Sequence, residues 1–325
     1  MLEVVAMKRT NIFCCALVIV CRILTKMKPL YILPFDHRGS FITMFGFRKD
    51  ALTPETRRIL TDYKHVIYEG FLKALAQGVP KDTAAILVDE EFGARIQEEA
   101  RAENVIRLLP VEKSGQELFD FAYGPSFGEH VNRFKPDYVK ALVHYNPRGD
   151  AQTNRTQCER LKTLAAFCAA NGYRFLFELL SPPTPDDLAK CGGDAQRYDR
   201  EERFNVMREA IRELQECGIE PDVWKVEGLN DEQQMSAVVG EARRDKREKV
   251  GVVVLGRGED EAKVRVWLSV ATRVPGIIGF AVGRTVFRDP LLAFHQKQIS
   301  RDAAATAIGE KYKSFADLFE RAQHD

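Results

Sequence analysis

The segment Pro221-Asp-Val-Trp-Lys-Val-Glu-Gly228 sets a lysine within a short apolar run. The run has the length of a buried β-strand, and amphipathic helical patterns lie on both sides of it, at residues 200–217 and 231–243. A charged ammonium is disfavoured in a β core, so Lys225 is expected either to form a salt bridge or to stay partly neutral for chemistry. The same helix–strand–helix unit, repeated along the chain, predicts the fold.

Seven further apolar runs of strand type alternate with helical patterns from about residue 29 onward. The eight predicted strands are residues 31–35, 85–89, 105–110, 138–145, 173–179, 222–226, 250–255 and 277–282. Helical patterns include residues 54–78, 152–171, 200–217, 231–243 and 260–273. Eight strands alternating with helices over this length predict an α/β fold, a (β/α)8 TIM barrel. An open doubly wound sheet is the alternative, although no Gly-x-Gly-x-x-Gly follows the first strand.

Neither a Pro/Gly/Ser-rich linker nor an internal repeat divides the chain, so residues 29–325 are expected to form one domain. The longest insertion, residues 181–199, is predicted to be a loop after the fifth strand. Residues 1–28 form an N-terminal extension, in which an apolar stretch at 11–24 follows Lys8 and Arg9 like a short signal-peptide core. We interpret this extension as an over-extended start site, with a weak membrane anchor as the alternative.

The composition is that of a globular protein with a full core, with 45% hydrophobic residues among 325. The 48 basic residues nearly balance the 47 acidic ones, so a whole-chain field that favours nucleic acid or anionic membranes is excluded. Four of the seven cysteines lie outside the N-terminal extension, and their spacing matches neither a zinc site nor a disulfide framework. A cytoplasmic protein with reduced thiols and no metal is therefore expected.

Polar and charged side chains follow the predicted strands at the ends where a barrel gathers its catalytic groups. They are Asp36, His37, Arg38 and Ser40 after the first strand, Asp89 at the second, Lys140, His144 and Tyr145 on the fourth, Glu178 on the fifth, Lys225 and Glu227 on the sixth, Arg257 after the seventh and Arg284 after the eighth. A single charged residue at a strand end is commonly just solvated. Ionisable groups on so many strands together favour an active site.

Strand parity relates three of these side chains, because residues two apart on a strand point to the same face. If the faces that carry Lys140, Glu178 and Lys225 point into the barrel, two lysines and a glutamate converge. A second ammonium near Lys225 would favour its free amine, which attacks a ketone to form a Schiff base, and Glu178 would serve as the proton shuttle. The alternative is a purely structural ion pair between Lys140 and Glu178.

Two Gly-Arg pairs at the ends of the last two strands, Gly256-Arg257-Gly258 and Gly283-Arg284, suit a phosphate group. Glycine lets backbone amides approach an anion, arginine binds two oxygens at once, and these loops are the usual phosphate site of the barrel. A phosphorylated substrate is therefore expected.

Five motifs resemble one family: Pro34-Phe-Asp-His-Arg-Gly-Ser-Phe41, Val88-Asp-Glu-Glu-Phe-Gly93, Val139-Lys-Ala-Leu-Val-His-Tyr145, Phe177-Glu-Leu-Leu180 and Val223-Trp-Lys-Val-Glu227. They are similar to the class I aldolases typified by tagatose 1,6-bisphosphate aldolase. They look closer still to the aldolase-like domain fused behind a sugar kinase in proteins of myo-inositol catabolism. The resemblance extends over nearly everything after residue 29 and implies the (β/α)8 fold.

The resemblance also implies the site residues. Lys225 is the implied Schiff-base lysine and Glu178 the implied acid/base, with Asp36 and Lys140 as catalytic pocket residues. Substrate or phosphate contacts are implied at Arg38, Ser40, Asp89, Tyr145, Gly256, Arg257, Gly283 and Arg284.

For the inositol branch, the implied reaction is the retro-aldol cleavage of 6-phospho-5-dehydro-2-deoxy-D-gluconate to dihydroxyacetone phosphate and malonate semialdehyde. It requires no metal or other cofactor, because a protonated imine serves as the electron sink. A tagatose bisphosphate and a sulfonated sugar phosphate are alternative substrates. Expected partners are the substrate, a second copy of the chain and a separate sugar kinase, and neither nucleic acid nor a stable membrane association is expected.

Two other kinds of protein stay open at this point. A metal-dependent aldolase or lyase on the same barrel would draw its ligands from His37, His144, Asp36, Asp89 and Glu178. The other is a catalytically silent domain that binds a sugar phosphate or docks on a kinase, although such a domain has no need for both Lys225 and Glu178.

Overall fold

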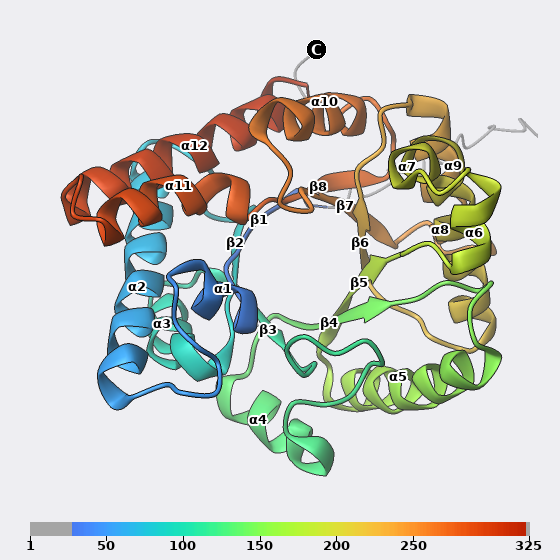
Figure 1. The fold of residues 1–325 in the computed structure, drawn as a ribbon, viewed down its shortest axis with the longest axis horizontal. Helices are drawn as coiled ribbons and strands as arrows, with labels where there is room; N and C mark the ends of the chain where they lie inside the picture. Colours follow the sequence, from blue (N-terminus) through green and yellow to red (C-terminus); the bar gives the residue numbers. More distant parts are fainter. Residues whose placement is uncertain (1–27, 323–325) are drawn as a thin grey trace, which may run out of the picture.

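The structure, a computed structural model, describes residues 28–322. Eight parallel strands close into a barrel in sequence order, and Figure 1 shows them as the inner ring of the molecule. The strands are β1 (Leu30–Pro34), β2 (Ala84–Leu87), β3 (Ile106–Pro110), β4 (Tyr138–His144), β5 (Arg174–Leu180), β6 (Val223–Glu227), β7 (Gly251–Leu255) and β8 (Ile277–Ala281). The predicted single-domain (β/α)8 TIM barrel is confirmed.

Helices surround the strands as an outer ring (Figure 1). They are α1 (Gly39–Met44), α2 (Pro54–Ala76), α3 (Glu90–Ala102), α4 (Phe127–Phe134), α5 (Ala151–Asn171), α6 (Pro185–Lys190), α7 (Ala195–Glu201), α8 (Arg203–Glu216), α9 (Glu232–Ala242), α10 (Glu261–Ala271), α11 (Arg284–His295) and α12 (Arg301–Arg321), with a 3-10 turn η1 (Gly124–Ser126) before α4. Side-chain caps set several helix starts, for example Thr53 before α2, Asp150 before α5 and Asp260 before α10. Each of the five predicted helical patterns contains a helix.

The interior of the barrel has an apolar floor to which each strand contributes one or two side chains. Leu30, Ile32, Ala85, Leu87, Leu108, Tyr138, Leu176, Val223, Val253 and Ala281 form this floor. Residues of the opposite parity, such as Phe177 and Trp224, belong to the larger core between the strands and the helices. On β4, β5 and β6 the next inward position above the floor is charged, so Lys140, Glu178 and Lys225 stand at the carboxyl half of the barrel.

The ring closes between the first strand and the last. β1 pairs with β8 as well as with β2, and Leu30 lies opposite Gly279 in that register. The hydroxyl of Tyr312 on α12 donates to the carbonyl of Tyr31 over 2.7 Å, and the hydroxyl of Tyr31 donates to Glu320 over 2.7 Å. Helix α12 packs along α2, as Figure 1 shows. The two ends of the described chain therefore hold each other in place.

The prediction of a loop over residues 181–199 was wrong, because two short helices occupy this insertion. Thr184 caps α6 and forms a capping box with Asp187, while Pro185 takes the first helical position, where its missing N–H costs nothing. Asp194 caps α7 through its side chain, which accepts from the Gln196 amide. Pro185 at the start of α6 and Gly192, with positive φ directly after its C-cap residue, are therefore signals of a helix start and a helix end.

The prediction made for residues 1–28 falls, apart from Lys28, outside the described residues. Within residues 28–322, no helix is both long and apolar enough to cross a membrane.

Candidate active site

Four consecutive strands deliver an alternating row of acids and lysines to the carboxyl end of the barrel. Glu112 follows β3, Lys140 lies on β4, Glu178 on β5 and Lys225 on β6, and all four side chains are buried. Lys140 Nζ lies 2.6 Å from Glu112 Oε1 and 3.0 Å from Glu178 Oε2. Lys225 Nζ lies 2.7 Å from Glu178 Oε1. The predicted convergence of Lys140, Glu178 and Lys225 is therefore present in the structure.

The strand register explains why Glu178 lies between the two lysines. Glu178 is directly opposite Lys225 in the β5–β6 pairing, whereas Lys140 is opposite Leu176, one inward step below Glu178. Each oxygen of the Glu178 carboxylate thus contacts a different ammonium group. Burial opposes the charge of this carboxylate, but Lys140 and Lys225 outweigh burial and lower the pKa of Glu178.

Lys140 is the centre of the cluster. Its Nζ also lies 2.8 Å from Asp36 Oδ2, so three carboxylates surround one ammonium that has three N–H bonds. Burial opposes the charge of Lys140, but Asp36, Glu112 and Glu178 together raise its pKa well above the ordinary value. Burial likewise opposes the charge of Asp36, and Lys140 nevertheless holds the pKa of Asp36 below its usual range. Lys140 therefore stays an ammonium and fixes the orientation of the acids around it.

Glu112 was not among the predicted site residues. It stands two residues beyond Pro110, the last residue of β3, and so has the inward parity of that strand. A bridge between Glu112 and Phe121 then turns the chain back on itself. Parity continued past the end of the apolar run is the signal that identifies this residue.

His37 and Arg38 line the same mouth of the barrel, next to Asp36. The guanidinium of Arg38 donates to the backbone carbonyl of Glu112 and lies 3.9 Å from its carboxylate. Burial lowers the pKa of His37 to about 4, against the opposing effect of Asp36, so its imidazole is neutral near pH 7. His37 Nδ1 and Arg38 Nε are buried and have no hydrogen-bond partner among the described residues. These atoms are free to bind polar groups of a ligand.

Of the two arginines predicted to bind phosphate, Arg257 is already engaged. Its Nη1 lies 2.7 Å from Asp199 on α7, and its Nε lies 3.3 Å from Glu227 on β6. Glu227 also pairs with the buried Arg203 over 3.0 Å. Arg257 therefore holds the inserted helix α7 against the barrel, and an incoming phosphate would compete with two carboxylates for it.

Arg284 has no such competitor. Its Nη2 donates to the backbone carbonyl of Arg257 over 3.0 Å, and its side chain lies against Gly258, where an added Cβ would approach the guanidinium to 2.6 Å. Within residues 28–322 neither Arg284 nor Arg288, one turn further along α11, forms an ion pair. Two guanidinium groups without a direct ion-pair partner on one helix favour an anionic ligand.

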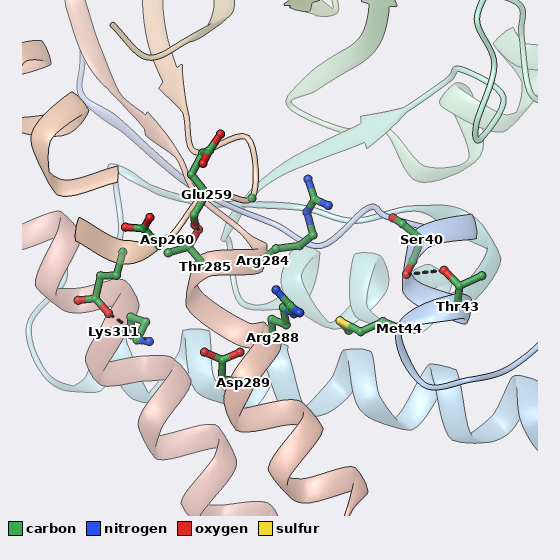
Figure 2. A pocket seen from close by; sticks show the side chains of 12 residues that line it. Ser40, Thr43, Met44, Glu259, Asp260, Arg284, Thr285, Arg288, Asp289 and Lys311 are labelled. Carbon is green, nitrogen blue, oxygen red and sulfur yellow. Dashed lines mark hydrogen bonds and ion pairs between the residues drawn. The ribbon is translucent and has the colours of Figure 1, made fainter. Parts of the chain in front are cut away.

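A cavity of about 510 Å³ opens beside these arginines (Figure 2). Ser40, Thr43 and Met44 of α1 form one wall, and the segment from Gly258 to Glu261 forms another. Figure 2 shows Arg284 and Arg288 between these two walls. Of the predicted phosphate residues, Ser40 and Arg284 line this cavity. Gly256 follows β7 and Gly283 is the N-cap residue of α11, and neither lines the cavity.

Gly283 is required by packing. A Cβ at this position would lie 2.0 Å from the carbonyl oxygen of Pro34 on the neighbouring β1. The close approach brings the amino end of α11 next to the end of β1, where the charge of Arg284 contributes to lowering the pKa of His37.

Two predicted substrate-binding residues do not reach the cluster. Tyr145 has the outward parity of β4, and its hydroxyl donates to Glu213 on α8 over 2.7 Å. Asp89 has inward parity, but it caps α3 by accepting from the Phe92 amide over 3.0 Å and forms an ion pair with the fully buried Lys64 of α2. Both side chains hold the barrel to its helices.

The acids of the alternative metal site all form ion pairs with lysines. Asp36 and Glu178 contact Lys140, while Asp89 contacts Lys64. Over the described part of the chain, no group of three or more His, Cys, Asp or Glu side chains is arranged to hold a metal ion. Cys158, Cys168, Cys191 and Cys217 are free thiols, as predicted.

Comparisons with known proteins agree with the barrel. The sequence profile of DUF2090, described as "Uncharacterized protein conserved in bacteria", matches residues 16–323. No curated protein matches the chain. The solved structure of Cgl0159 from Corynebacterium glutamicum superposes on this chain with a TM-score of 0.53 and 17% sequence identity. The alignment covers 86% of this chain and 84% of the Cgl0159 chain. The solved structure of the fructose-bisphosphate aldolase from Slackia heliotrinireducens superposes with a TM-score of 0.52 and 14% sequence identity. The alignment covers 87% of this chain and 86% of the aldolase chain. At these identities the likeness shows the fold alone.

Proposed function

The chain belongs to the DUF2090 family, and we propose that it is a carbon–carbon lyase, a class I aldolase that forms a Schiff base between Lys225 and the ketone of a phosphorylated keto-sugar. One observation carries the proposal. Lys225 lies 2.7 Å from a carboxylate that it shares with a second buried lysine, at the carboxyl end of the barrel strands.

The contact between Lys225 and Glu178 supplies the proton transfers that imine formation needs. Glu178, held as a carboxylate, takes a proton from the Lys225 ammonium and frees the nitrogen lone pair for attack on the ketone carbon. The same acid then returns the proton to the departing hydroxyl of the carbinolamine, which leaves as water. One residue within hydrogen-bond reach of Nζ serves both steps.

The resulting iminium draws electrons from the neighbouring carbon–carbon bond, so the bond breaks to give an aldehyde and an enamine. Lys140 acts as a positioning residue in this scheme, because its three N–H bonds face three carboxylates. Asp36 is held beside Lys140 and faces the same space, where hydroxyl groups of the substrate would bind.

The cavity beside Arg284 supports a phosphate at one end of the substrate. Arg284 and Arg288 form no ion pair within residues 28–322, and Ser40 and Thr43 of α1 line the same cavity (Figure 2). The family resemblance adds the preferred substrate, 6-phospho-5-dehydro-2-deoxy-D-gluconate, which would give dihydroxyacetone phosphate and malonate semialdehyde. Tagatose bisphosphate and a sulfonated sugar phosphate are the alternative substrates.

Borohydride trapping tests the proposal directly. The protein is mixed with dihydroxyacetone phosphate, reduced with borohydride and analysed by intact mass and peptide mapping. We expect a stable adduct on Lys225, and none on the equally buried Lys64. A folded protein that gives no adduct overturns the Schiff-base mechanism. In that case, loss of turnover in EDTA would indicate a metal-dependent lyase, and thermal stabilisation by sugar phosphates without turnover would indicate a binding domain.

A further inference from the structure

Glu112 is a buried acid of the cluster to which the imine steps assign no task. We propose that its carboxylate takes the proton of the substrate hydroxyl on the carbon that becomes the aldehyde, and so acts as the base for cleavage of the carbon–carbon bond. The inference rests on the proposed function and adds a second acid–base residue to it.

The carboxylate oxygens of the cluster differ in whether they already have a partner, and this difference identifies Glu112 as the candidate base. Both oxygens of Glu178 contact lysines, and Asp36 Oδ2 contacts Lys140. Glu112 Oε1 is also held by Lys140, but Glu112 Oε2 is the one buried carboxylate oxygen among residues 28–322 that has no hydrogen-bond partner. A buried acceptor without a partner is costly, and a substrate hydroxyl would satisfy it.

The surroundings of Glu112 fix the direction of that oxygen. Lys140 holds Oε1 at 2.6 Å, and the guanidinium of Arg38 holds the backbone carbonyl. The bridge to Phe121 fixes the backbone itself. With these contacts made, Oε2 keeps one orientation and is ready to accept a hydrogen bond without reorganisation.

The strand order places Glu178 and Glu112 at different positions along a bound substrate. Glu178 on β5 is next to Lys225 on β6, and Glu112 after β3 lies on the other side of Lys140 on β4. A substrate bound to Lys225 through its ketone therefore has Glu178 next to the imine nitrogen. The substrate carbons beyond the ketone then extend past Lys140 toward Glu112.

The cleavage step balances with these groups alone. The hydroxyl proton moves to Glu112 Oε2, and the O–H electron pair forms the carbonyl of the departing aldehyde. The electron pair of the broken carbon–carbon bond forms the double bond of the enamine, and the π pair of the iminium moves to the Lys225 nitrogen. Protonation of the enamine and hydrolysis by water then release the ketone product.

The test uses the variant Glu112→Gln, which keeps the size of the side chain and removes the base. Two readouts with dihydroxyacetone phosphate need the imine but no bond cleavage: the borohydride adduct on Lys225, and deuterium exchange from solvent at the carbon next to the ketone. We expect both to stay near the wild-type level. Cleavage of 6-phospho-5-dehydro-2-deoxy-D-gluconate, followed as release of dihydroxyacetone phosphate, is expected to fall about 10²- to 10⁴-fold.

Two further variants separate a chemical role from a structural one. Glu112→Asp keeps a carboxylate and is expected to recover part of the cleavage rate. Glu213→Gln changes a half-buried carboxylate that accepts from Tyr145 outside the barrel, and is expected to leave all three readouts unchanged.

Cleavage by Glu112→Gln at the wild-type rate would overturn the role of Glu112. An equal loss of adduct, exchange and cleavage would also overturn it, because Glu112 would then only hold Lys140 in place. A wild-type protein that forms no adduct instead overturns the proposed function itself.

Discussion

The barrel buries lysines in two places, and the two sites differ in what surrounds the ammonium. Lys64 on α2 is fully buried, with one carboxylate partner, Asp89, and the carbonyl of His37 at 3.1 Å. The rings of Phe41 and Phe92 lie 5.2 and 5.6 Å from its Nζ. Lys225, by contrast, lies in the middle of β6 inside the barrel and shares its carboxylate partner with a second lysine.

The pKa values of Lys64 and Lys140 shift in opposite directions, because the two lysines have different numbers of carboxylate partners. Burial lowers the pKa of Lys64, and its single carboxylate partner does not outweigh burial. Burial acts on Lys140 too, but three carboxylates outweigh it and raise the pKa. Burial of a lysine therefore does not by itself mark a reactive site. What distinguishes the candidate site is a carboxylate shared by two lysines, together with nearby hydrogen-bonding atoms that have no partner within the described residues.

The largest expected effect comes from Lys225→Ala. The variant should fold, because Glu178 keeps Lys140 as a partner. Turnover should fall by about 10⁴-fold or more, since the covalent intermediate cannot form. Steady-state rates and circular dichroism of both proteins give the measurement. Normal turnover in the alanine variant would remove Lys225 from the mechanism.

Lys64→Met should affect stability rather than chemistry. The substitution leaves the carboxylate of Asp89 buried without its ammonium, which costs on the order of 3–5 kcal/mol in the free energy of unfolding. Adding Asp89→Asn should recover most of this loss, because asparagine can still cap α3. Urea titration gives the free energies, and the exposed pair Lys73–Asp302 provides the control, since Lys73→Met should cost at most about 1 kcal/mol. Loss of the borohydride adduct in a folded Lys64→Met protein would erase the distinction between the two sites.

Glu178→Gln should slow the imine steps while substrate still binds. We expect turnover to fall about 10²-fold, the usual effect of removing a general acid–base group. The rate of adduct formation with dihydroxyacetone phosphate should fall in parallel, in a rapid-quench experiment with borohydride. If Glu178 served only as a structural ion-pair partner of Lys140, the unfolding free energy would change and the trapping rate of the folded protein would not.

Arg284 and Arg257 should differ in the same assay, although both follow a glycine at a strand end. Arg284→Ala is expected to raise KM for a phosphorylated substrate about 10-fold, because it removes a charge-assisted hydrogen bond to the phosphate. Arg257→Ala should change KM less and stability more, because Arg257 pairs with Asp199 and Glu227. Equal effects on KM would place both guanidinium groups on the phosphate.

A pH-dependent effect on stability is expected from His37, whose carbonyl contacts Lys64 while its ring lies near Asp36. Burial lowers the pKa of His37 from 6.5 to about 4, so between these pH values the unfolded chain binds a proton that the native protein does not. The free energy of unfolding should therefore fall as pH drops from 6.5 to about 4. Urea titrations should show a flatter dependence for His37→Gln in that range, and an unchanged slope would contradict a neutral buried imidazole.

Periodicity is sufficient to predict the barrel and the core of the site. The apolar runs have the period of strands, and their parity alone predicts that Lys140, Glu178 and Lys225 can share the interior of the barrel. The same rule applied one step past Pro110 would have indicated Glu112. Lys64 could not be recognised, because a lysine within a helical pattern is normally exposed. Its burial depends on contacts with Asp89, His37 and the rings of Phe41 and Phe92, which the helical pattern does not predict. The pairing of Arg257 with Asp199 depends on the helices of the 181–199 insertion, which periodicity does not position.

The closure of the ring between β1 and β8 has a consequence for synthesis. The hydrogen bond from Tyr312 to the carbonyl of Tyr31 joins residues 281 positions apart, and Asp36 reaches Lys140 from the strand that this closure holds. A ribosome releases β1 first and must then deliver nearly the whole chain before β8 and α12 can secure it. During that interval Lys225 and Glu178 emerge without a complete pocket around them. The complete pocket therefore forms only in a late step of synthesis, once β8 has paired with β1.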